Sequence, residues 1–103
     1  MVPDSLLEEV ARRFALLGDP TRLRILRTLH EEGELAVGEL AQRSGVTREN
    51  VSAHLARLAT AGVVVRRREG TSIIYAIRDK SVSEMCELVC IGLRERARDL
   101  AGL

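Results

Sequence analysis

The feature that most constrains this chain is a short helix-like run, a glycine turn and a longer helix-like run, after which the spacing of apolar residues changes. Apolar residues recur at helical spacing over 37–43 and again over 47–61. Between these runs, the Ser-Gly-Val segment at 44–46 predicts a tight turn. From Val63 the apolar residues alternate with a period of two, and Gly70 predicts a hairpin turn. This order predicts a helix-turn-helix followed by a β-hairpin wing.

Further helices are predicted on both sides of this unit. Residues 5–17 and 81–100 are expected to form the outermost helices, and each segment begins with the Ser-x-x-Glu pattern of a capping box. Asp19 followed by Pro20 predicts the start of another helix. The apolar stripe of that helix is predicted at Leu23, Leu26 and Leu29, with Ile25 on its flank.

The predicted fold is therefore a mainly α-helical winged helix-turn-helix, with about five helices, a two-stranded wing and a short strand at residues 35–36. A length of 103 residues predicts one domain spanning residues 1–103. The outermost helices carry apolar faces that one subunit cannot easily cover, which predicts a homodimer joined through them. The residues expected in this interface are Leu6, Val10, Val82, Met85, Val89 and Leu93.

Basic residues are concentrated in the helix-turn-helix and the wing. The whole chain has a net charge of only +1, but the segment from Thr47 to Arg68 contains five arginines and a single acid, Glu49, which gives a local charge of +4. A patch of this kind binds polyanions through counterion release. Any one of these arginines is equally well explained as a solvated surface residue, but five of them on this motif favour DNA.

The second helix of such a motif enters the major groove, where its first residues meet base edges. Arg48 suits guanine and Asn50 suits adenine. His54 is expected to pack inside the motif or to contact a phosphate, rather than to bind a metal ion. The predicted DNA-binding residues are Thr47, Arg48, Asn50, Ser52, Ala53, His54, Arg57, Arg66, Arg67 and Arg68.

Several classes of protein are not expected. No apolar run is long enough to cross a membrane, and residues 1–5 lack the basic start of a signal peptide, so the chain is expected in the cytoplasm with no membrane partner. No Ser/His/Asp set, glycine-rich phosphate loop or full set of metal ligands occurs, so no enzyme activity is expected. Cys86 and Cys90 have a spacing that suits neither a disulfide framework nor a CxxC motif.

A resemblance to a known family is carried by several segments of the chain. These are FALLGDPTRLRIL at 14–26, ELA at 39–41, VSAHLARL at 51–58, AGVV at 61–64 and a glycine-turned wing that ends in Tyr75. Together they resemble the ArsR/SmtB family of bacterial winged-helix metalloregulators, and the first and third segments are fairly specific as a pair. The resemblance implies a homodimer that binds an inverted-repeat operator in double-stranded DNA. It also implies a repressor that an inducer, usually a metal ion, releases from DNA.

The chain departs from the family at both of its known metal sites. Many members carry ELCVCDL on the short helix as a thiolate site, whereas residues 34–40 here read ELAVGEL and lack both cysteines. Other members bind zinc-type ions between the last helices of two subunits, through Asp, His, His and a Glu or His. The matching positions here are Asp79, Ser81, Gly92 and Glu95, which keep two oxygen ligands and lose both imidazoles. Such a remnant is expected to bind zinc weakly at best.

Two further candidates for an effector site stay open. His30, together with Glu31, Glu32 and Glu34, could form an oxygen and nitrogen site for a harder ion such as nickel, although capping a helix end is its simpler role. Cys86 and Cys90 share one helix face, and a two-fold dimer would bring four thiols together as a thiophilic metal site or a redox switch. The simpler explanation is that these cysteines pack as small apolar side chains.

Two other functions compete with an effector-controlled repressor. A regulator without an effector of its own would take its signal from an accessory protein, and the depleted set of metal ligands keeps this alternative open. A winged helix used only for protein contacts would leave its basic surface idle, and the local charge of +4 between Thr47 and Arg68 argues against it.

Overall fold

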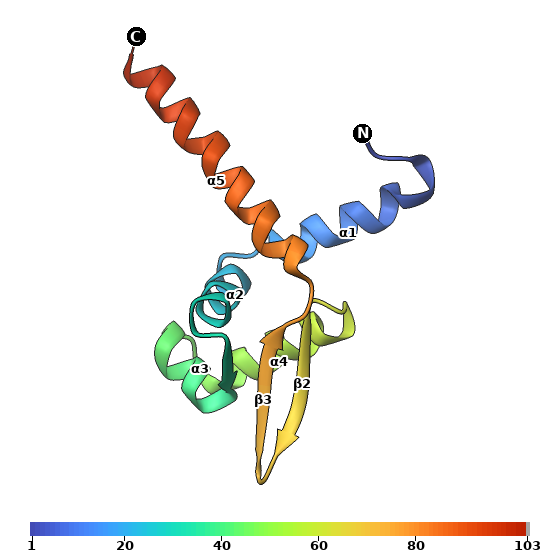
Figure 1. Ribbon diagram of the computed structural model, residues 1–103, viewed down its shortest axis with the longest axis vertical. Coiled ribbons are helices and arrows are strands. Elements are labelled where there is room, and N and C mark those ends of the chain that lie inside the picture. The colour runs from blue at the N-terminus through green and yellow to red at the C-terminus, as the bar shows by residue number, and fades with distance from the viewer. Residues whose placement is uncertain (103) are drawn as a thin grey trace.

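The computed structural model describes residues 1–102 and consists of a body of helices and sheet from which two helices project (Figure 1). In chain order the elements are a 3-10 helix η1 (Asp4–Leu6), helices α1 (Leu7–Leu17) and α2 (Pro20–Glu32), strand β1 (Glu34–Ala36), helices α3 (Val37–Ser44) and α4 (Arg48–Thr60), strands β2 (Val64–Glu69) and β3 (Ser72–Ile77), and helix α5 (Lys80–Ala101). Helices α1 and α5 diverge from one end of the body, and the hairpin of β2 and β3 extends from the other. The predicted winged helix-turn-helix is confirmed.

The sheet contains three antiparallel strands in the order β1-β3-β2, which is one strand more than the two predicted for the wing. The short strand predicted at residues 35–36 pairs with the returning strand of the wing, so that Leu35 lies opposite Tyr75. On the other side of β3, Val64 lies opposite Ile77. Leu35, Val64 and Tyr75 are all buried, so the base of the wing is part of the hydrophobic core.

Local capping signals place the helices of the motif as predicted. The Asp19 carboxylate accepts a hydrogen bond from the Arg22 backbone amide at 2.9 Å and caps α2. The Thr47 hydroxyl accepts one from the Asn50 amide at 3.3 Å and caps α4. Between α3 and α4, Gly45 has a φ of 74°, a left-handed conformation that glycine adopts at no steric cost.

Two other predicted helix starts are wrong. Ser5 makes no capping hydrogen bond, because the chain around it forms the 3-10 turn η1, and α1 begins at Leu7. Ser81 does not cap α5 either. The cap is Asp79, whose carboxylate accepts a hydrogen bond from the Ser81 backbone amide at 3.0 Å, and the helix begins at Lys80. A charged carboxylate is a stronger acceptor than a hydroxyl, which explains why the earlier residue takes this position.

The buried side of α2 is also rotated from the prediction. Ile25, which was expected on the flank of the apolar stripe, is 0% exposed, whereas Leu23, expected within it, is 37% exposed. Helix α3 and strands β1 and β3 contact α2, and the core includes Ile25 and Leu29. The side of α2 that is buried is therefore set by what packs against it, rather than by the spacing of leucines.

The rotation of α2 can be tested by truncating two side chains of similar size on the same helix. We expect Ile25→Ala to lower the free energy of unfolding by about 2–5 kcal/mol, because it leaves a cavity in the core. Leu23→Ala, the matched control, should lower it by less than about 1 kcal/mol, since its side chain is already partly in water. Urea unfolding of both variants measures this difference, and equal losses would contradict the observed orientation of α2.

Candidate nucleic-acid interface

Helix α4 is fixed by one side and open on the other. Its residues Val51, Leu55 and Leu58 are each 0% exposed and belong to the core. The opposite side and the capping position carry most of the predicted DNA-binding residues, all of them exposed: Thr47, Arg48, Asn50, Ser52, Ala53 and Arg57. The first turns of α4 are therefore free to enter a groove while the underside holds the helix rigid.

His54 differs from the other predicted residues of α4. It is half-buried, and its Nδ1 atom is buried without a hydrogen-bond partner among residues 1–102. The pKa of Asp19 lies below its usual value because the Arg22 backbone amide donates to the carboxylate, with smaller contributions from the charges of Arg22 and His54. His54 thus lies near the start of α2, as expected for a packing role, but it lacks the hydrogen bond expected with that role.

The three arginines of the wing do not share one face of the sheet. Side chains alternate along a strand, so Arg66 and Arg68 lie on the same face as the buried Val64. This is the face that covers the core, and the two arginines extend it toward the tip of the hairpin. Arg67 lies on the opposite face, although all three arginines are exposed.

Arg67 is paired with two carboxylates of the protein. Its guanidinium makes ion pairs with Glu34 of β1 and with Glu69 of its own strand, both at 2.8 Å. The hydrogen bond from Arg67 also holds the pKa of Glu34 below its usual value. In the described part of the chain, Arg66 and Arg68 make no such ion pair, so they carry the charge of the wing that is available to a ligand.

Helices α1 and α5 carry apolar side chains that this chain does not cover. The large exposed apolar residues at the two ends of the chain, from η1 to α1 and along α5, include Leu6, Leu7, Phe14, Leu88, Val89, Ile91, Leu93 and Leu100. The predicted exposure of Val82 and Met85 is wrong, because Val82 is 1% exposed and Met85 packs against the core, so both attach α5 to the body. Val10 is half-buried. Within residues 1–102, neither α5 nor any other helix is long and apolar enough to span a bilayer.

The candidate metal ligands are not brought together within one chain. Among residues 1–102, no group of three His, Cys, Asp or Glu side chains is arranged to hold a metal ion. His30 is exposed at the end of α2, and Glu95 is exposed on α5. Cys86 is half-buried and Cys90 is exposed, and burial, together with the nearby Cys90, raises the pKa of the Cys86 thiol. Within the described part of the chain, these candidates therefore do not form a site of three ligands.

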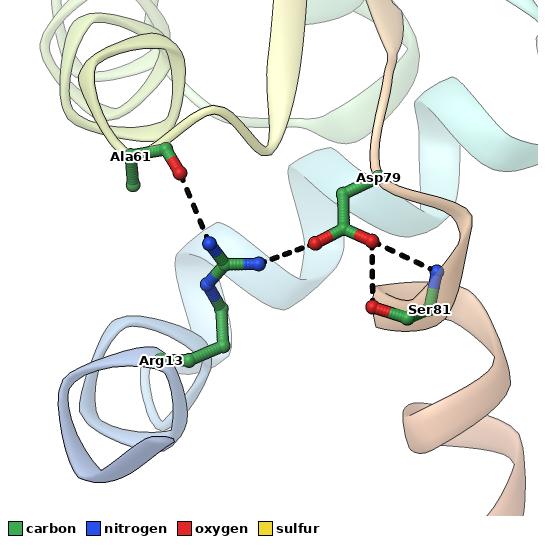
Figure 2. A network of polar contacts seen from close by, with 4 residues as sticks. All are labelled: Arg13, Ala61, Asp79 and Ser81. Carbon is green, nitrogen blue, oxygen red and sulfur yellow. Dashed lines mark hydrogen bonds and ion pairs between the residues drawn. The ribbon is translucent and has the colours of Figure 1, made fainter. Parts of the chain in front are cut away.

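Asp79, the remaining candidate ligand, is engaged by other protein groups (Figure 2). Its Oδ1 atom accepts hydrogen bonds from the Ser81 hydroxyl at 2.6 Å and from the Ser81 amide at 3.0 Å. Its Oδ2 atom accepts one from Nη1 of Arg13 at 2.5 Å. The Ser81 hydroxyl and, to a lesser degree, Arg13 hold the pKa of Asp79 below its usual value, although partial burial opposes them. Both carboxylate oxygens are thus occupied by protein donors.

Sequence reasoning missed Arg13. From α1, its second terminal nitrogen donates a hydrogen bond to the Ala61 carbonyl at 3.0 Å. Its two partners lie 48 and 66 positions further along the chain, so no local pattern marks this residue. Arg12, its neighbour, has the same side chain but, among residues 1–102, pairs only with Glu8 and Glu9 of its own helix.

Known proteins match both the sequence and the fold of this chain. Residues 17–67 match a helix-turn-helix domain family. The HTH-type transcriptional regulator MJ1325 of Methanocaldococcus jannaschii is 40% identical over 82 residues, which cover 80% of this chain and 92% of that protein. The crystal structure of AntR, an antimony-specific transcriptional repressor, matches with a TM-score of 0.83 and 34% identity over 95% of this chain and 88% of AntR. The homodimeric winged helix-turn-helix DNA-binding domain of Mb0332 from Mycobacterium bovis matches with a TM-score of 0.79 and 35% identity, over 95% of this chain and 93% of that domain.

These matches extend over the elements that form the candidate interface and over the projecting helices. The similar proteins are DNA-binding transcriptional regulators and not enzymes, which favours DNA binding over a winged helix used only for protein contacts. The chain is a DNA-binding transcriptional regulator of the ArsR/SmtB family of metal-responsive winged-helix proteins.

Proposed function

We propose that this chain is a repressor that acts in the cytoplasm as a homodimer on an inverted-repeat operator, and that a metal ion controls its affinity for DNA. The observation that carries the proposal is the exposed first half of α4, which presents Arg48 and Asn50 above a completely buried underside. Arg66 and Arg68 of the wing add two positive charges without partners in the described part of the chain. We assign Arg48 and Asn50 to base contacts and the wing to phosphate contacts.

The proposed dimer follows from the surface of the projecting helices. Helix α5 has 22 residues, and Val82 is its one buried residue. A second copy related by a two-fold axis would cover the exposed apolar side chains of α1 and α5 in both subunits with one self-complementary contact. The whole chain, residues 1–103, would then be a single DNA-binding domain whose terminal helices form the interface. The similar domain of Mb0332 is homodimeric, which supports this arrangement.

The proposed role of α4 is tested by selecting a DNA site from random duplexes and then measuring variants on it. We expect a near-palindrome whose half-sites lie about 10–10.5 base pairs apart, or a multiple, and a dimer of the 11.4 kDa chain in sedimentation at micromolar concentration. Arg48→Ala and Asn50→Ala should each cost about 1–3 kcal/mol of binding free energy and relax the base preference at one position. Normal binding by both variants, or a monomer that selects no site, would contradict the proposal.

The wing is tested by changing its three arginines one at a time. Arg66→Gln and Arg68→Gln should each weaken binding to all duplexes. Since each change removes one phosphate contact from both subunits of the dimer, the slope of log affinity against log salt should fall by about 1.8. Arg67→Gln, the matched control, should change this slope less, because its guanidinium already pairs with Glu34 and Glu69. A larger effect of Arg67→Gln than of the other two would show that DNA displaces those carboxylates.

The identity of the metal ion is proposed from the donors that a dimer would bring together. The similar protein AntR is antimony-specific, which supports a metal or metalloid effector. Oxygen and nitrogen donors such as Glu95 and His30 would suit nickel or zinc, whereas Cys86 and Cys90 would suit a thiophilic ion or a redox signal. Asp79 would join the first set only by giving up its hydrogen bonds with Arg13 and Ser81. We favour the first set, because the rise in the Cys86 pKa makes its thiolate harder to form. Failure of every ion to change operator binding would point to an accessory protein.

The two kinds of donor are separated by the double variant Cys86→Ser, Cys90→Ser. We expect the variant to bind the operator and to keep its response to nickel or zinc, while its dimer dissociates more readily because two small apolar side chains have become polar. Operator affinity measured with and without each ion, together with sedimentation, gives both results. Loss of every response to metal ions and oxidants, with operator binding intact, would instead assign sensing to the thiols.

A further inference from the structure

Three elements far apart in sequence meet at the side chain of Arg13 (Figure 2). Arg13 belongs to α1, and its two terminal nitrogens donate to the Asp79 carboxylate and to the Ala61 carbonyl. Asp79 is the capping residue of α5, and Ala61 is the C-terminal capping residue of α4. One planar guanidinium therefore connects both projecting helices to the end of the helix that is proposed to read DNA.

The two groups that accept hydrogen bonds from Arg13, the Asp79 carboxylate and the Ala61 carbonyl, suit a guanidinium. The last carbonyls of a helix lack partners within the helix, and the C-terminal end carries partial negative charge, so a cation is stabilised at Ala61. The carboxylate of Asp79 adds a full negative charge, and the side chains of Arg13 and Asp79 are 32% and 29% exposed, which limits screening by water. The fork of an arginine can satisfy two acceptors in fixed directions, which the single ammonium of a lysine cannot do as well.

Backbone hydrogen bonds beside the Arg13 contact also connect the end of α4 to the start of α5. The Val63 carbonyl, just beyond α4, accepts hydrogen bonds from the amides of Arg78 and Asp79 at 2.9 and 3.2 Å. These bonds fix the start of α5 to the end of α4 without any side chain. Arg13 adds α1 to the same connection, so a rotation of α1 and α5 in one direction must move the C-terminal end of α4 with it.

We propose that Arg13 is a positioning residue that sets the angle of α4 relative to α1 and α5, and thereby the distance between the two reading helices of the dimer. This inference rests on the proposed function, because α1 and α5 must form the interface across the two-fold axis. Since the core holds α4 rigidly, α4 turns relative to α1 and α5 together with the body. It has 13 residues and is about 20 Å long, so a turn of about 10° about its C-terminal end moves its first turn by about 3 Å. That displacement is comparable with the rise of one base pair, about 3.4 Å.

The spacing of the two half-sites is the property that tests this role. The selected operator is compared with versions that have one base pair added or removed between its halves. Wild-type protein should bind the altered spacings at least about ten-fold more weakly, a difference of about 1.4 kcal/mol. Arg13→Gln should bind the correct spacing about ten-fold more weakly than wild type and should lose most of its preference between spacings. Its dimer in sedimentation should stay intact.

Three further variants separate positioning from loss of charge and from loss of a helix cap. Arg12→Gln removes the same charge from the next residue of α1, whose pairs stay within that helix, and should bind and discriminate spacings as wild type does. Asp79→Asn keeps a good N-cap for α5 but removes the ion pair, so it should lose spacing preference as Arg13→Gln does. Arg13→Lys should fall between wild type and Arg13→Gln.

The outcomes distinguish this inference from the proposed function. If wild-type protein selects no operator, the proposed function fails and the inference fails with it. If wild type discriminates spacings and Arg13→Gln does so equally well, the positioning role alone is wrong. If Arg13→Gln does not fold or dimerise, Asp79→Asn decides, and an unchanged spacing preference in that variant overturns the proposal.

Discussion

The structure depends on the burial of one side of α4. Val51, Leu55 and Leu58 are fully excluded from water, and the surrounding helices and the base of the wing pack around them. This burial gives the helix a fixed orientation without using any residue of its outer side. The outer side chains, apart from the capping Thr47 and the half-buried His54, are thus not needed to hold the helix in place. The exposed side of α4 is rigid because the apolar side chains beneath it are fixed in the core, and its own side chains are mostly polar.

Much of this support was predictable from local sequence, because it depends on neighbours within a few residues. Thr47, Asp19 and Gly45 act within one turn of themselves, and their roles were predicted correctly. Prediction failed where a second element decides the outcome. Ile25 replaces Leu23 in the core because of what packs on α2. The start of α5 was missed for a local reason, because the Asp79 carboxylate is a stronger acceptor than the Ser81 hydroxyl. Arg13 was missed altogether, since both of its partners are distant in sequence.

A count of charged residues along the sequence does not show how the charge is divided between the two faces of the sheet. Three consecutive arginines on β2 add equally to a local net charge, but the alternation of a strand separates them into two faces. The middle one is held by Glu34 of β1 and by Glu69, and it therefore also links the wing to the strand that precedes α3. Among the described residues, the same residue type is left without an ion pair on one face and forms two ion pairs on the other. Sequence identifies the cluster, whereas only the register of the sheet identifies the role of each member.

The sparse attachment of α5 has a consequence for how such a regulator responds to its own abundance. Only Val82 of this 22-residue helix is buried in the chain itself, and a helix with so few tertiary contacts is marginally stable in water. In the proposed dimer, the full folding of α5 and the association of the two subunits would be a single thermodynamic step. Below the dissociation constant, the amount of competent protein then rises with the square of its concentration. A two-fold increase in synthesis would thus raise the amount of dimer about four-fold, before any effector is involved.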